Sequence, residues 1–300
     1  MAKKQTEFQQ FLDREVSKYK GVYVPVKAGI LRRLLVRKLP LNKMHPNPDD
    51  EFCFPNIGPN YQIISDYEQE MRQFQNDRQG ARIYGQKGAY QPLYVEKIRP
   101  DGYMILNGHH RWAAARKAGI SPLPVRIVDL TQKSDIQKML ASSNHDKRVT
   151  LDLDEVVFCT DDSQEAEKAL SFPYDRLYPQ RVRLGIPALF YYLNQNGYDI
   201  WVYTAQYYSA DQIMRLFRHY HVRVTGAVTG TARKGPQNAQ MKDSIEKLMS
   251  SKYQSTLHID RESVLYIKKT SGEVEEYPVS ADSAWSTQVI DIIGKTAGKK

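Results

Sequence analysis

The chain has 300 residues, of which 41% are hydrophobic and 26% charged, and it carries a formal net charge of +9. This length favours two globular domains, with one long α/β domain as the main competitor, and the composition excludes a disordered or fibrous protein. No apolar run is long enough to span a membrane, the first residues lack the apolar core of a signal peptide, and the two cysteines lack Cys-x-x-Cys spacing, so we expect a cytoplasmic protein without a disulfide framework or a thiolate zinc site.

The positive charge is concentrated near the N-terminus. Residues 1–43 hold eleven Lys or Arg against three Asp or Glu, a net charge of +8. The cluster Arg32, Arg33, Arg37 and Lys38 would suit the phosphate backbone of a nucleic acid, although such runs are more often a solvated helix face. We predict a basic helical arm over residues 1–35, with nucleic acid as a candidate partner.

The next segment predicts a small, mixed α/β domain over residues 36–130. Four prolines among Asn and Asp predict a loop at 45–59. Apolar patterning predicts helices at 67–76 and 111–118 and strands at 93–98, 103–106 and 125–128. Gly119 fits as the C-cap of the second helix. A polar, partly helical connector at 131–146 then predicts the domain boundary.

From residue 149 the pattern changes to apolar strands that alternate with longer helices. The predicted strands are 149–153, 199–203, 222–226 and 256–259, and the predicted helices are 178–196, 210–220 and 238–250. This alternation predicts a parallel, doubly wound sheet in a second domain over 147–295. In such sheets, ligands bind beyond the carboxyl ends of the strands.

Three of these strands end in residues suited to chemistry. Asp152 and Asp154 end the first strand, Thr204 follows the second, and Asp260 follows the last. We expect these ends to meet at one edge of the sheet. A carboxylate there could attack a phosphoryl group, a second could protonate the leaving oxygen, and paired acids supply oxygen ligands for Mg²⁺. The alternative is a set of Asp-rich turns that terminate buried strands.

The segment Asp-Leu-Asp-Glu-Val-Val at 152–157 resembles the first motif of the haloacid dehalogenase superfamily, Asp-x-Asp-x-Thr/Val, and the strand ending in Thr204 is similar to the second. Over 147–295 the resemblance implies a Rossmannoid fold and phosphomonoester hydrolysis through an aspartyl-phosphate. It makes Asp152 the nucleophile and an Mg²⁺ ligand. It makes Asp154 the general acid and base, which binds the metal through its carbonyl, and Thr204 a contact to the phosphoryl group.

The other two motifs of that superfamily are matched less closely. The third is a lysine on the helix before the last strand, for which we assign Lys242, with Lys234 as the alternative. The fourth would make Asp260 a metal ligand, but it usually contains two closely spaced acids. Here Arg261 follows, and Glu262 is the nearest substitute. A degenerate, inactive copy of the fold therefore stays open.

The motif spacing bears on the substrate. Thr204 follows Asp152 by 52 positions and Asp260 follows Thr204 by 56, too few for a large inserted cap domain. Capless members of the superfamily present an open site to large substrates. The resemblance therefore implies a phosphorylated substrate such as a phosphoprotein or a nucleic-acid end.

A glycine turn in the first half carries Gly108, His109, His110 and Arg111 between a predicted strand and a predicted helix. Three features of this turn could bind a phosphate group: free backbone N–H groups at a helix start, a glycine that lets the ligand approach closely, and an arginine guanidinium that can donate to two oxygens. These four residues are the predicted nucleotide or phosphate site. The alternative is that the histidines are ordinary turn residues without a ligand.

This turn resembles the Gly-x-x-Arg signature of the ParB/sulfiredoxin fold, with Ala-rich residues, Gly119 and a Pro-containing strand at 122–125 following in the family's order. Residues 39–41 and 45–48 are similar to the family's opening strand and loop. Sulfiredoxins carry a nucleophilic Cys directly after the glycine. Here His109 takes that position, so sulfiredoxin chemistry is excluded.

The second resemblance implies nucleotide binding, with ATP, ADP or CTP as candidates, and three activities known in the family: nucleotide-gated DNA clamping, nuclease action and phosphorylation of free serine. For the kinase, Asp49, Asp50 and Glu51 could supply a carboxylate base. Three hypotheses follow. The chain is a nucleotide-binding module joined to an Mg²⁺-dependent phosphatase, a DNA- or RNA-binding protein with a structural or degenerate second domain, or a free-amino-acid kinase.

Overall fold

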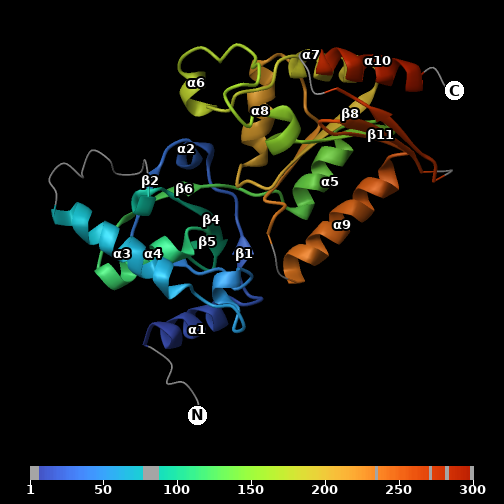
Figure 1. Cartoon of the computed structure of the whole chain (residues 1–300). Helices are drawn as coiled ribbons and strands as arrows, with labels where there is room; N and C mark the ends of the chain where they lie inside the picture. The colour runs from blue at the N-terminus through green and yellow to red at the C-terminus, as the bar shows by residue number, and fades with distance from the viewer. Residues whose placement is uncertain (1–6, 77–87, 234–235, 270–271, 281–283, 298–300) are drawn as a thin grey trace. The chain divides into compact units, whose positions relative to one another are not determined.

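The computed structural model describes residues 7–76, 88–233, 236–269, 272–280 and 284–297 (Figure 1). The chain divides into two compact units. The first unit comprises residues 1–129 together with 233–238, and the second comprises 130–232 and 239–300. None of the helices in the described ranges is long and apolar enough to cross a membrane.

The first unit is a mixed α/β structure, as predicted. Its elements are α1 (Glu7–Tyr19), β1 (Val24–Pro25), α2 (Ile30–Arg33), β2 (Arg37–Leu39), η1 (Leu41–Lys43), β3 (Met44–His45), η2 (Glu51–Cys53), α3 (Tyr61–Asn76), η4 (Gly88–Tyr90), β4 (Leu93–Arg99), β5 (Tyr103–Asn107), α4 (His109–Ala118) and β6 (Leu123–Ile127). The sheet order is β2-β6-β4-β5-β3, and β1 pairs with β4. Parallel and antiparallel pairs are both present.

The N-terminal segment is more than a basic arm. Leu12 of α1 is buried in the core of the first unit. The rings of Phe8 and Phe11 lie 6.4 and 6.1 Å from that of Trp112 on α4. The apolar side of α1 therefore packs on its own unit.

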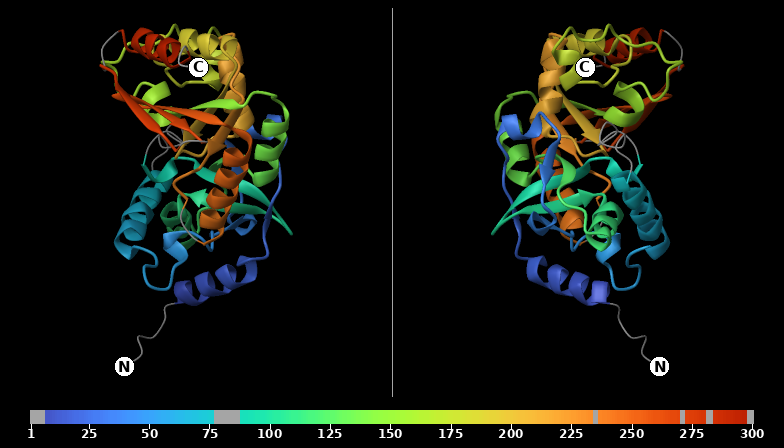
Figure 2. Two further views of the ribbon diagram at one scale, coloured as in Figure 1. Left: turned by 90° about the vertical axis from the view of Figure 1, so that its right-hand side faces the viewer. Right: turned by 90° about the vertical axis from the view of Figure 1, so that its left-hand side faces the viewer.

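The second unit has a six-stranded sheet. Its elements are α5 (Lys133–Ala141), β7 (Lys147–Asp152), the π-helical turn η5 (Leu153–Val157), α6 (Tyr174–Leu177), α7 (Ile186–Gln195), β8 (Tyr198–Thr204), α8 (Ala210–His219), β9 (Gly226–Thr229), α9 (Pro236–Lys252), β10 (Ser255–Ile259), β11 (Ser263–Lys268), β12 (Val274–Pro278) and α10 (Trp285–Ala297). Figures 1 and 2 show α7 and α10 over one face of the sheet and α5 and α9 over the other.

The sheet of the second unit is mixed, which corrects the prediction of a parallel one. Its order is β12-β11-β10-β7-β8-β9, and β10, β7, β8 and β9 are parallel neighbours. The edge strands β11 and β12 are antiparallel. β12 carries two glutamates and has no buried side chain, whereas β11 contains the apolar run 264–267, which was not predicted as a strand.

The predicted linker at 131–146 also needs correction. Residues 133–141 form helix α5, whose Ile136 and Met139 belong to the core of the second unit. Thr131 Oγ1 donates a hydrogen bond of 2.8 Å to the carbonyl of Ala227 on β9. This segment is therefore a packed part of the second unit.

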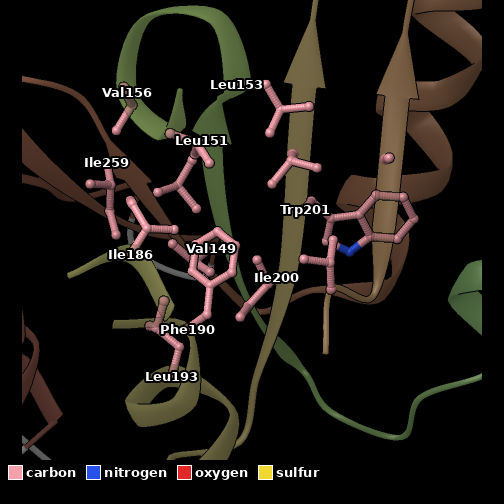
Figure 3. Close-up of a cluster of buried hydrophobic side chains, with 14 of the residues drawn as sticks. Val149, Leu151, Leu153, Val156, Ile186, Phe190, Leu193, Ile200, Trp201 and Ile259 are labelled. Atoms are coloured by element: carbon pink, nitrogen blue, oxygen red, sulfur yellow. The ribbon is translucent and has the colours of Figure 1, made fainter. Parts of the chain in front are cut away.

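The core of the second unit is built around β7. Val149 and Leu151 are fully buried, together with Ile200 and Trp201 of β8 and Phe190 of α7 (Figure 3). In β7 the apolar residues alternate with the buried polar residues Arg148 and Thr150, whereas β8 is apolar on both faces over 200–202, as is usual for a central parallel strand. This packing fixes the position at which β7 ends, and with it the position of Asp152.

Candidate functional sites

The strand ends in the second unit meet at one edge of the sheet, as the sequence predicted. β7 lies between β8 and β10 and is parallel to both. Asp152 lies opposite Tyr203, one position before Thr204. Leu151 lies opposite Ile259, so Asp260 follows its strand where Asp152 ends its own.

Asp152 is held by the turn that follows it. Its Oδ1 accepts hydrogen bonds from the backbone N–H groups of Asp154 at 2.7 Å and Glu155 at 2.9 Å. Its Oδ2 has no hydrogen-bond partner among the described residues. The turn is π-helical, a geometry that often occurs at functional sites. One carboxylate oxygen is thus oriented by the backbone while the other stays open.

Asp154 is positioned by the neighbouring strand. Thr204 Oγ1 lies 2.9 and 2.8 Å from its two carboxyl oxygens, and the N–H of Ala205 donates to Oδ2 at 2.9 Å. Burial, the largest effect, raises the pKa of Asp154, while the bonds from Thr204 and Ala205 oppose that rise. A carboxyl with a raised pKa keeps its proton to higher pH, which suits a general acid.

Thr204 differs from its predicted role as a phosphoryl contact. Its side chain is fully buried, its hydroxyl faces Asp154, and its Oγ1 accepts a bond of 3.0 Å from the N–H of Gln206. A hydroxyl without exposed surface meets no substrate in this structure. Thr204 is instead a positioning residue for Asp154.

Asp260 and Lys242 lie at the surface. Asp260 Oδ1 accepts a bond of 2.7 Å from the N–H of Arg261, and its own N–H donates to Ser263 at 2.9 Å as the β11 hairpin begins. Lys242 is exposed on α9, one turn before buried Ile245, and makes no ion pair or hydrogen bond within the described residues. The alternative, Lys234, lies outside those residues.

The predicted metal site has two side-chain ligands. The described residues contain no group of three His, Cys, Asp or Glu side chains that could hold a metal ion. The predicted set is smaller, since Asp152 and Asp260 are its carboxylate ligands and Asp154 is predicted to bind only through its carbonyl. Carboxylate oxygens such as those of Asp152 and Asp260 are hard donors, the type that Mg²⁺ prefers, and Mg²⁺ commonly binds through one or two carboxylates with waters and substrate oxygens.

Asp154 also lines a cleft that sequence reasoning missed. The cleft has a volume of about 460 Å³ and is lined by Asp154, Phe158, Cys159, Pro179, Gln180, Arg181, Gln206 and Tyr208. Most of these residues follow the first motif or lie in the loop at 158–185, where no motif drew attention. Val182 and Arg183 pair with Phe158 and Ala166 there, so the helix predicted from 178 begins only at Ile186.

Arg111, in the first unit, is not presented to a ligand as predicted. It is 7% exposed. Its Nη1 donates to the carbonyl of Gln91 at 2.7 Å, and its Nη2 donates to Asn107 Oδ1 at 3.0 Å. These partners occupy the guanidinium fork. Arg111 therefore braces the turn from inside.

The two histidines also support the turn. His109 is 4% exposed, its Nε2 accepts a bond of 3.2 Å from the N–H of Asn47, and its Nδ1 lies 3.5 Å from Asp50. His110 Nε2 accepts a bond of 3.1 Å from the N–H of Asn60. Burial lowers the pKa of both rings, which favours the neutral, accepting form. Both histidines thereby hold the proline-rich loop against the turn.

The part of the turn that could contact a ligand is its backbone. Gly108 has φ 100°, in the left-handed region, and α4 begins at the next residue. The N–H groups of His109, His110 and Arg111 have no acceptor among the described residues. These are the first-turn donors that an anion can accept at a helix start.

The basic cluster divides into buried and exposed members. The Nε of Arg33 lies 3.0 Å from Asp129 Oδ2 and donates to the carbonyl of Ala28 at 3.2 Å, and the side chain is 10% exposed. Arg37 donates to the carbonyls of Leu31 and Arg32 from an exposed position, and Arg32 is exposed. Arg33 is therefore structural, which corrects its grouping with the nucleic-acid contacts.

Residues 31–144 match the family of the ParB N-terminal domain. The N-terminal part of the chain is a ParB-like domain. The match begins before the predicted bound of 36 and continues past 130 through α5, which groups with the second unit.

Individual relatives cover small parts of the chain. A stretch of 65 residues is 35% identical to a probable plasmid-partitioning protein ParB from Thermus thermophilus, covering 22% of each protein. The solved chromosome-partitioning protein ParB of Caulobacter crescentus is 26% identical in its complex with CTP-γ-S, covering 32% of this chain and 46% of that one at a TM-score of 0.24. Its complex with the centromeric parS site is 22% identical, covering 35% and 46% at a TM-score of 0.22.

A conserved hypothetical protein from Pyrococcus furiosus is 15% identical, covering 85% of this chain and 98% of that one at a TM-score of 0.23. The chain spans about a fifth of the curated ParB relative, at 22%, and about half of the solved ParB structures, at 46%. The three TM-scores are too low to establish a shared fold.

Proposed function

We propose that this chain joins a ParB-like domain that binds nucleotide or nucleic acid to an Mg²⁺-dependent phosphomonoesterase in the second unit. The proposal of hydrolase activity rests on the pair of carboxyl groups that follows β7. Asp152 has one oxygen held by two N–H groups and one open, and Asp154 beside it has a raised pKa. The family match at 31–144 supports the binding role of the first part.

The hydrolysis proceeds in two displacements. Asp152 Oδ2 attacks phosphorus, the bond from phosphorus to the leaving oxygen breaks, and Asp154 gives its proton to that oxygen. Asp154 then takes a proton from water, whose oxygen attacks the aspartyl-phosphate and releases phosphate and the Asp152 carboxylate. Asp152, Asp260 and the backbone carbonyl of Asp154 would hold Mg²⁺, which would neutralise the charge of the phosphoryl group.

Thr204 contributes to both steps by orientation. Its hydroxyl and the N–H of Ala205 hold the Asp154 carboxyl at the sheet edge. A fixed acid needs no reorganisation when the leaving oxygen acquires charge. Lys242 is retained as the predicted partner of the phosphoryl oxygens, since it is exposed on α9 and has no competing acceptor among the described residues.

The test compares wild type with Asp152→Asn on 3′- and 5′-phosphorylated oligonucleotides and small phosphomonoesters, with Mg²⁺ or with chelator. We expect wild type with Mg²⁺ to release phosphate and Asp152→Asn to be slower by roughly a thousandfold or more, as for removal of a nucleophile. Glu155→Gln is the matched control because Glu155 is the adjacent exposed acid. Equal turnover by wild type and Asp152→Asn would refute the mechanism.

The ParB-like domain is proposed to bind the phosphates of ATP, ADP or CTP at the start of α4. The open N–H groups of residues 109–111 and the left-handed Gly108 support this placement. Calorimetric titration should show binding of a nucleoside triphosphate that the unphosphorylated nucleoside does not displace. Equal competition by that nucleoside would place recognition on the base instead.

A second candidate is a DNA- or RNA-binding protein whose second unit is structural, which the family match favours. It predicts salt-dependent DNA binding without phosphate release from any substrate.

The serine-kinase alternative has less support from the geometry. Asp50 accepts a bond from the N–H of Phe52 and lies beside His109, while Asp49 accepts a bond of 3.3 Å from Tyr23. ADP formation that depends on free serine would nevertheless establish it.

A further inference from the structure

The position of Asp154 fixes where a leaving group must lie. A general acid has to reach the oxygen that departs, so the atoms attached to that oxygen extend past the acid. Asp154 lines the cleft of about 460 Å³. The remaining walls of this cleft therefore surround the part of the substrate beyond the scissile bond, and the volume is in the range of small-molecule sites.

One wall of the cleft is aromatic. The rings of Phe158 and Tyr208 have centroids 6.4 Å apart and meet edge to face at 77°. Phe158 is buried and is held from both sides, because its N–H donates to the carbonyl of Leu153 and it pairs with Val182. Tyr208 is partly exposed. The partly exposed Tyr208 ring, packed edge to face on the buried Phe158 ring, offers an aromatic surface on which a planar ring can stack.

The rim of the cleft is polar. Gln206 is exposed, and its side-chain amide has no hydrogen-bond partner among the described residues. Arg181 Nη1 pairs with Asp162 at 2.5 Å and also donates to the carbonyl of Asp161 at 3.3 Å, and its Nη2 donates to the carbonyl of Gln164 at 3.2 Å. The Asp162 side chain is fully solvent-exposed, so this ion pair is weak and a phosphate oxygen could replace the Asp162 carboxylate. The amide can donate to and accept from a base edge, and the guanidinium can bind a phosphate oxygen pair.

We propose that this cleft is a leaving-group subsite that takes the nucleoside part of a nucleotidic phosphomonoester. The proposal rests on the phosphatase function of the second unit. The base stacks on Tyr208 against the Phe158 wall, Gln206 contacts the base edge, and Arg181 binds the next phosphate when the nucleotide ends a strand. A phosphotyrosyl leaving group would use the aromatic wall but would make no use of Gln206 and Arg181.

The experiment measures kcat/KM for a nucleoside monophosphate, a 3′-phosphorylated oligonucleotide, phosphotyrosine and glycerol phosphate. Tyr208→Ala should lower kcat/KM for both nucleotidic substrates by about tenfold, the size of one base–aromatic stack, and change glycerol phosphate less than about twofold. Tyr208→Phe should retain the wild-type preference. Tyr191→Ala is the matched control, since Tyr191 is 59% exposed on α7 of the same unit and does not line the cleft.

Arg181→Gln distinguishes a free nucleotide from the end of a nucleic-acid strand as the substrate. It should weaken turnover of the oligonucleotide but not of the nucleoside monophosphate, because only a strand supplies a second phosphate. Equal losses on all four substrates in Tyr208→Ala, or a preference of wild type for phosphotyrosine, would overturn the subsite.

Failure of the phosphatase itself would be visible separately, as a wild type that hydrolyses none of the four substrates. Equilibrium binding of the nucleoside monophosphate then decides the subsite. Binding weakened about tenfold by Tyr208→Ala and unchanged by Tyr191→Ala supports it, and equal binding by both variants overturns it.

Discussion

Arg111 shows how one side chain can match a ligand motif and still serve the fold. Its sequence context, directly after a glycine turn, is typical of a phosphate-binding arginine. In the structure its donors meet Gln91 and Asn107, and the side chain is buried. The spacing located the turn correctly, but a linear motif does not say whether the guanidinium points outward or inward.

Arg111→Lys should therefore destabilise the first unit. A lysine keeps the charge but cannot satisfy both acceptors in the fixed fork geometry, and we expect the free energy of unfolding to fall by about 2 kcal/mol. Urea denaturation measures the loss. Arg99→Lys is the control, since Arg99 is exposed at the end of β4 in the same unit. Equal stability of the two variants would contradict the stabilising role of the Arg111 side chain.

Asp154 gives the second prediction at this scale. Its raised pKa means that it holds a proton above the usual carboxyl range, so kcat/KM should fall as the pH rises through that pKa and the acid is lost. The bond from Thr204 stabilises the charged form. Thr204→Val should therefore raise the pKa further and move the alkaline limb of the pH profile upward. A limb that moves to lower pH would show that Thr204 does not act through Asp154.

At the scale of elements, the glycines at the two ends of α4 differ in how closely other atoms surround them. Both have positive φ, 100° at Gly108 and 72° at Gly119. A Cβ on Gly108 would lie 2.9 Å from Leu93 Cγ and 3.0 Å from Arg111 Nη2, whereas a Cβ on Gly119 would meet nothing within 4 Å. Backbone strain is common to both positions, and crowding is confined to the first.

Gly119→Ala should thus cost about 1 kcal/mol of unfolding free energy, from the left-handed backbone alone. Gly108→Ala should cost about 1–3 kcal/mol more, because Leu93 and the Arg111 fork must both move. The difference in thermal unfolding midpoint between the two variants measures the cost of crowding at Gly108. Identical midpoints would mean that the turn can relax without disturbing Arg111.

Elements with strong periodicity were predicted well, and those without it were not. β8 was expected at 199–203 and occupies Tyr198–Thr204, because a central strand is apolar on both faces. β12 was missed because its exposed, acidic residues resemble a loop, whereas β11 contains the apolar run 264–267 and could have been predicted. The strand-end site was predictable because parallel register follows from alternation. The cleft was not, since its loop residues are brought together by bridges and hydrogen bonds that no periodic pattern announces.

For the whole molecule, the uneven charge suggests where a polyanion would bind. The net charge of +8 over residues 1–43 nearly equals the +9 of the entire chain. Arg33 does not contribute an available contact, because it is paired with Asp129 inside the first unit. Arg32, Arg37 and Lys38 are the exposed members of the cluster, and Arg32 and Arg37 are its exposed arginines.

Replacing both Arg32 and Arg37 by Gln should weaken DNA binding uniformly across sequences. The plot of log K against log salt should lose about two units of slope, one for each phosphate contact removed. Fluorescence anisotropy at several salt concentrations measures this. Lys247→Gln with Lys269→Gln removes the same charge from exposed positions in the second unit. An equal loss of slope in that control would show that net charge, not this cluster, sets binding.

The position of Cys159 offers a chemical reporter for the cleft. Cys159 lines the cleft, whereas Cys53 belongs to the first unit and is more deeply buried. Burial raises the pKa of both thiols, and the shift is the larger at Cys53. An alkylating reagent at alkaline pH should consequently label Cys159 first, and a ligand seated between Arg181 and Tyr208 should slow that labelling. The chain thus carries a built-in footprinting probe that reads occupancy of the cleft without any turnover.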